Sequence, residues 1–188
     1  MKSVVLSVIL AFIFAGCKNE KSNNTDDSGN KAEIVSSELA TSNSIADNIV
    51  NNYLKLKNAL ASDNDKEAAN YGKALEEAIS NFDKSKMTQE QLANYTELED
   101  DMREHAEHIG ANAGNISHQR EHFDLLSKDM IDFVKIAGSS QTLYQEYCPM
   151  YDNNKGASWL SQQKEISNPY MGKRDSGCGS VQETISPK

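Results

Sequence analysis

The stretch SIADNIVNNYLKLKNAL, residues 44–60, decides the fold. Its apolar side chains recur every three or four residues, so they lie along one side of an α-helix. This stripe consists of Ile45, Ile49, Tyr53, Leu56 and Leu60. A helix with one apolar side must bury that side against other elements. The stretch therefore predicts the first helix of a bundle.

Three more stripes with the same spacing follow along the chain. They consist of Tyr71, Leu75, Ile79 and Phe82, then Leu92, Tyr95, Met102 and Ile109, then Ile116, Phe123, Met130, Phe133 and Ala137. Thr88 and Gln91 match a capping box before the third helix, Gly110 and Gly114 interrupt it, and Asn115 can cap the fourth. Short connections favour antiparallel neighbours. The sequence predicts an all-α, antiparallel up-and-down four-helix bundle over residues 43–138.

Residues 139–188 differ in character from the helices. They contain the only tryptophan of the chain, Trp159, together with Cys148 and Cys178. A segment rich in aromatic residues buries them instead of staying solvated. We expect an irregular arm of the same domain, anchored on the bundle by Trp159. Arg120 lies near the fourth stripe, and we expect it to join the arm to the bundle by pairing with a carboxylate or with carbonyl groups.

The N-terminus resembles a lipoprotein export signal. An apolar stretch too short to span a bilayer, Val4 to Phe14, follows Lys2 and leads to Phe14-Ala15-Gly16-Cys17. The small residues before the cysteine are similar to a lipobox. We expect residues 1–16 to be removed, Cys17 to carry the lipid anchor and residues 17–42 to form a disordered tether. The alternative is an ordinary signal peptide with an incidental cysteine. We expect the protein in the cell envelope, where the lipid anchor would hold it to a membrane on the periplasmic side or at the cell surface.

Composition argues against several classes of function. The formal net charge of −9 leaves no basic surface for a nucleic acid. A glycine-rich phosphate loop is missing from the sequence. A motif that pairs a nucleophile with a base is also missing. We therefore predict that the chain is not an enzyme.

Four motifs in the arm carry a resemblance to a known family. They are Tyr147-Cys148-Pro149-Met150, Trp159-Leu160, Asn168-Pro169-Tyr170 and Cys178-Gly179. In this order they resemble a bacterial envelope family of unknown function whose members stand alone or are fused to periplasmic adaptor subunits of copper and silver efflux systems. The resemblance implies a helical domain that handles copper or silver, with an efflux adaptor as partner.

The sulfur-containing residues of the arm form the first candidate metal site. Soft thiolate and thioether ligands select Cu(I), and the candidates are Cys148, Met150, Cys178 and Met171. Family members usually carry a methionine just before the second cysteine, where this chain has Lys173 to Ser176, so Met171 is only a substitute. The alternative for Cys148 and Cys178 is a disulfide, which would stabilise the arm by roughly 3 to 4 kcal/mol.

The histidines form a second candidate site. His105 and His108 precede the turn predicted at residues 110–115, and His118 and His122 follow it. A spacing of three or four places each pair on one side of its helix, and an antiparallel hairpin would bring the pairs to one end of the bundle. Imidazoles arranged in this way suit Zn(II), Cu(II) or Ni(II). The alternative is one packed histidine and three solvated ones.

Two functional hypotheses follow from the sequence. In the first, a lipid-anchored module binds Cu(I) or Ag(I) and buffers it or delivers it to heavy-metal efflux. In the second, a disulfide-stapled helical domain recognises a protein partner without metal. The redox state of Cys148 and Cys178 separates the two.

Overall fold

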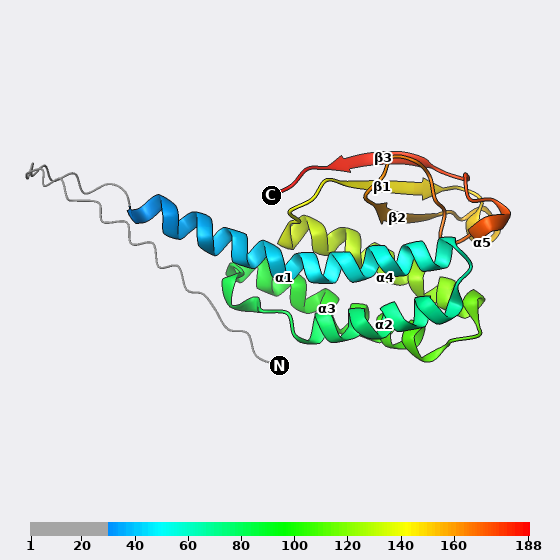
Figure 1. Cartoon of the computed structure of the whole chain (residues 1–188), viewed down its shortest axis with the longest axis horizontal. Coiled ribbons are helices and arrows are strands. Elements are labelled where there is room, and N and C mark those ends of the chain that lie inside the picture. Colours follow the sequence, from blue (N-terminus) through cyan, green and yellow to red (C-terminus); the bar gives the residue numbers. More distant parts are fainter. Residues whose placement is uncertain (1–29) are drawn as a thin grey trace, which may run out of the picture.

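Four long helices pack together as a bundle (Figure 1). The computed structural model describes the backbone of residues 30–188 and the side chains from residue 46 onward. The helices are α1 (Asn30–Ala61), α2 (Asp65–Ser80), α3 (Gln89–Ala111) and α4 (Ile116–Ala137), with a short 3-10 turn η1 (Lys84–Lys86) between α2 and α3. Each helix contacts the next along the chain, and α4 also contacts α1. The predicted set of four packed helices is confirmed.

The expected tether overlaps the first helix. The helix α1 begins at Asn30, well before the expected bundle boundary at residue 43. The export signal at residues 1–16, Cys17 and the tether as far as residue 29 lie outside the described residues. Of the helices in the described part of the chain, none has the length and apolar character needed to cross a membrane.

Side-chain caps explain where the helices begin. The predicted capping box is confirmed, because Thr88 Oγ1 accepts a hydrogen bond from Gln91 N while Gln91 Oε1 accepts one from Thr88 N. Asn64 accepts from Glu67 N at the start of α2, and Asn115 accepts from His118 N at the start of α4. These caps fix the short turns, and with them the antiparallel order of the helices.

The chain is mostly helical but not all-α, because the arm contains a small sheet where an irregular segment was predicted. Three antiparallel strands, β1 (Leu143–Cys148), β2 (Ala157–Ser161) and β3 (Ser180–Ile185), lie in the order β2-β1-β3. The short segments α5 (Tyr151–Asn154) and η2 (Gly172–Arg174) lie between them. The strands lack alternating burial, since β1 buries the polar Glu146 and most of β3 is exposed. The sequence pattern that identifies a strand is therefore weak here.

The sheet packs on the bundle through β2, which contacts α4 and α1 (Figure 1). Trp159 of β2 is fully buried. The buried hydroxyl of Tyr53 in α1 lies 2.8 Å from Ser127 Oγ of α4 and accepts a hydrogen bond from Leu160 N of β2 at 3.1 Å. One side chain thus connects both helices to the sheet.

Gly110 does not interrupt α3, contrary to the sequence prediction, because the helix continues to Ala111. It lies where α3 crosses α2. A Cβ atom at Gly72 of α2 would meet Gly110 N at 2.7 Å. Glycine at this crossing serves close helix packing instead of ending the helix.

Replacing Gly72 by alanine should destabilise the protein. The added methyl group must push α2 away from the backbone of α3, which outweighs the gain in helix propensity, and we expect a net loss of about 1 to 2 kcal/mol. Urea unfolding measures it. Gly177→Ala is the matched control, since a methyl group at that position would meet no atom within 4 Å and stability should change by less than about 0.5 kcal/mol. Equal stability of the two variants would contradict the close crossing.

Candidate metal centre

The four histidines come from two antiparallel helices joined by a short turn. His105 and His108 lie in the last turns of α3, and His118 and His122 in the first turns of α4. The turn between them is held from outside, because Gly114 N donates to Asp65 Oδ2 at 2.6 Å. The connection is short and well anchored, so both pairs lie at the same end of the bundle, as the sequence predicted.

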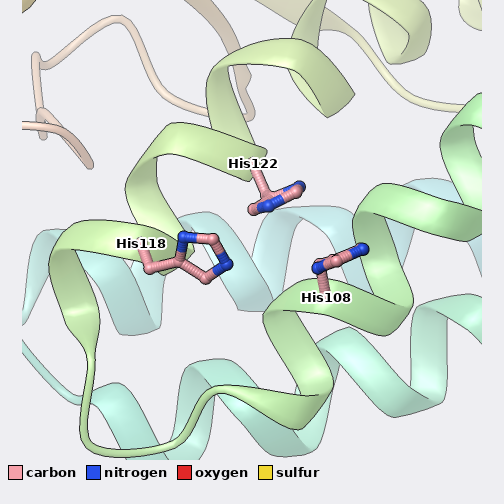
Figure 2. A group of neighbouring side chains, drawn as sticks. All are labelled: His108, His118 and His122. Atoms are coloured by element: carbon pink, nitrogen blue, oxygen red, sulfur yellow. The ribbon is translucent and has the colours of Figure 1, made fainter.

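Three of the histidines converge. One ring nitrogen from each of His108, His118 and His122 lies within 4.8 Å of those of the other two. Figure 2 shows the three rings gathered between α3 and α4. Nitrogens that share one tetrahedral zinc ion lie roughly 3.4 Å apart, given Zn–N bonds of about 2.0 to 2.1 Å. Side-chain rotations could therefore bring the three nitrogens from the observed spacing to the spacing that zinc requires.

One ring of the cluster would have to turn for a metal to bind. The rings of His108 and His122 are stacked with centroids 4.3 Å apart and an interplanar angle of 5°. His118 meets His122 edge-on, at 4.5 Å and 74°. Stacked rings direct their nitrogen lone pairs side by side, so a shared ion requires one ring to tilt. His108 is exposed and has room to do so.

His105 contacts His122 but is not one of the three converging histidines. The two Nδ1 atoms lie 3.3 Å apart, which allows a hydrogen bond when one ring carries its proton on that nitrogen. His122 thus contacts all three other histidines. A second group that bonds to a metal-ligating imidazole usually sets the orientation of its ring.

Two carboxylates border the cluster, and the sequence interpretation missed both. Glu121 Oε2 lies 3.4 Å from His118 Nδ1, and Glu104 Oε1 lies 3.9 Å from His108 Nε2. Each is three or four residues from its histidine in the same helix, so the spacing alone would have found them. Carboxylates next to imidazoles are typical outer partners in metal sites.

The ring of His122 is unprotonated at neutral pH, which favours metal binding. Burial, followed by the neighbouring histidines, lowers the pKa of His122 from 6.5 to about 4. Burial also lowers the pKa of His105. A neutral imidazole keeps the lone pair that a metal needs. The central ring of the cluster is therefore ready to bind at neutral pH.

The sulfur residues of the arm do not form a comparable site in this state. Cys148, at the buried end of β1, forms a disulfide with Cys178. A disulfide offers no thiolate to a metal. Met150 and Met171 line one cavity of about 550 Å³, and Met150 is 52% exposed. The two thioethers are thus brought to one cavity, while the two cysteines are bonded to each other.

Arg120 joins three parts of the molecule. Its Nε donates to Pro169 O of the arm at 2.7 Å, and its Nη2 donates to Leu60 O at 2.8 Å and to Asp63 Oδ1 at 2.6 Å. The hydrogen bond from Arg120 lowers the pKa of Asp63. These are the partners expected of a partly buried arginine, a carboxylate and carbonyl groups, and they join α4 to the α1–α2 turn and to the arm.

The protein is thus a four-helix bundle with a small antiparallel sheet and with a histidine cluster beside the turn between α3 and α4. Residues 49–142, half of the chain, match the family described as protein of unknown function (DUF3347). The chain belongs to this family. No curated protein and no solved structure matches it. The matched region contains all four histidines and Arg120 and ends before the strands of the arm.

The ring of His122 should titrate with a pKa of about 4 in the folded protein. The unfolded chain binds this proton near pH 6.5, so the free energy of unfolding should fall as the pH drops from about 6.5 toward 4. Ring-proton NMR measures the pKa, and urea unfolding across that range measures stability. In the variant His122→Gln, the free energy of unfolding should fall less over the same pH range. A ring that titrates near 6.5 would contradict the buried, neutral His122.

Proposed function

We propose that this chain binds a divalent transition-metal ion, Zn(II), Cu(II) or Ni(II), through His108, His118 and His122. The observation that carries the proposal is the convergence of three imidazole nitrogens from two helices within 4.8 Å. Imidazole is the protein ligand these three metals share. Three protein ligands leave a coordination position open to water or to another molecule.

The open position and the exposure of the rings favour a role in handling metal rather than in building the fold. The side chain of His108 is 45% exposed and that of His118 is 33% exposed. The core of the bundle is apolar and complete without the cluster. An ion held at this surface can exchange with a partner, so the domain would buffer metal or deliver it without catalysing a reaction.

The cell envelope is the compartment in which we place this function. The lipobox-like sequence at Phe14–Cys17 supports a lipid anchor at a membrane. The disulfide supports an oxidising compartment, since disulfides are rare in the cytosol. The resemblance of the arm motifs supports delivery to a periplasmic adaptor of a heavy-metal efflux system.

A second candidate function is Cu(I) or Ag(I) binding by the reduced arm. Reduction would free two thiolates at Cys148 and Cys178, and Met150 and Met171, near them in sequence, already line one cavity. Soft sulfur ligands select these ions. If neither site binds metal, the disulfide-stapled domain that recognises a protein partner remains.

The histidine site is tested by titrating purified protein with Zn(II) and with Cu(II) against a competing chelator. The double variant His108→Gln/His118→Gln should bind about a hundredfold more weakly or worse, because two of three ligands are lost. The matched control is Glu107→Gln, which removes an exposed charge of the same helix outside the cluster and should change affinity by less than about threefold. Unchanged affinity in the double variant would refute the site.

The sulfur site is tested with Cu(I) under two redox conditions. Protein reduced by a phosphine should compete with a Cu(I) chelator, and oxidised protein should compete at least about tenfold less, because its cysteines are not thiolates. Cys148→Ser/Cys178→Ser should remove the difference. Met87→Leu is the control, since this methionine lies in the bundle. Equal competition by oxidised and reduced protein would exclude the cysteines as ligands.

A further inference from the structure

A separate cavity lies where the α1–α2 turn, the start of α4 and the arm meet. It has a volume of about 550 Å³, and its lining includes Asp63, Ser117, Arg120, Tyr151 and Arg174. None of the four histidines lines it. The cavity is large enough for a small organic molecule.

The carboxylates of the cavity already have partners. Asp63 accepts from Arg120 Nη2 at 2.6 Å through Oδ1 and from Lys173 N at 3.0 Å through Oδ2. Asp152 pairs with Lys155 Nζ at 2.8 Å. These hydrogen bonds lower the pKa of both acids. Both carboxylates are therefore ionised and neutralised by neighbours.

The arginines, in contrast, keep donors free. Arg174 forms no ion pair with any carboxylate in the described part of the chain, and its Nη2 lies 3.9 Å from Met171 Sδ. Arg120 uses Nε and Nη2, while its Nη1 donates to no group among residues 46–188. The uncompensated charge of the cavity is thus positive, although the whole chain has a net charge of −9.

Aromatic and thioether side chains line another part of the cavity. The rings of Tyr151 and Tyr170 stack with centroids 4.5 Å apart, and Met150 is also part of the lining. A neighbouring hollow shares Ser117 and Tyr151 and is lined by Glu121 and Asp124. These two acids disfavour a second negative charge on anything that fills the cavity.

We propose that this cavity binds a small organic monoanion, a carboxylate that carries an aromatic or aliphatic group. The carboxylate is held by the guanidinium of Arg174, by Nη1 of Arg120 and by the hydroxyl of Ser117. The apolar group lies against Tyr151 and Met150. Guanidinium groups bind carboxylates through charge-assisted hydrogen bonds, which gives the charged end its preference for this place. This binding is independent of the histidine cluster.

The test is an amide NMR titration of the purified protein with 3-phenylpropanoate as the probe. Resonances of Ser117, Tyr151 and Arg174 should shift at millimolar concentration. The neutral 3-phenylpropanamide should bind at least about tenfold more weakly because it lacks the charge, and acetate more weakly because it lacks the ring.

Two arginine variants test which positive charge binds the carboxylate of the probe. Arg174→Gln removes an exposed side chain, so it should fold normally and lower the affinity for 3-phenylpropanoate about tenfold or more. Arg103→Gln removes the same charge from α3, outside the cavity, and should leave the affinity unchanged. The proposal is overturned if the acid does not bind, if the amide binds equally well, or if Arg174→Gln binds as tightly as the parent.

Discussion

The antiparallel packing of α3 on α4 across one short turn is the constraint on which the candidate site depends. Asn115 caps α4, and Gly114 N donates to Asp65 Oδ2 of α2, so the turn is fixed from both sides. Gln119 Nε2, one turn into α4, reaches Ile109 O of α3 at 3.2 Å and Asp65 O at 2.9 Å. With the helix ends held in this way, histidines of both helices must share one surface.

A second set of contacts holds the arm to this bundle. Tyr53 connects α1, α4 and β2 through its hydroxyl, and Arg120 connects α4 to the α1–α2 turn and to Pro169. The disulfide closes the arm between β1 and Cys178. The proposed metal site and the proposed arm cavity therefore rest on different contacts.

Helical spacing in the sequence was enough to predict the bundle and the histidine pairs. It could not tell which three rings converge, because that depends on how far each helix is rotated about its axis. The sheet was missed for a physical reason: β1 buries Glu146 in the interior, and β3 has little to bury, so neither strand alternates. Gly110 was misjudged because a glycine in a helix crossing and a glycine that ends a helix look the same in one sequence.

X-ray absorption spectroscopy of the Zn(II)-loaded protein tests the central claim most directly. It identifies the atoms that surround the bound ion. The account predicts a first shell of nitrogen at about 2.0 Å with the outer-shell scattering of imidazole rings, and no sulfur at about 2.3 Å. A shell that contains sulfur, or one of oxygen without imidazole scattering, would contradict the assignment of His108, His118 and His122 as the metal ligands.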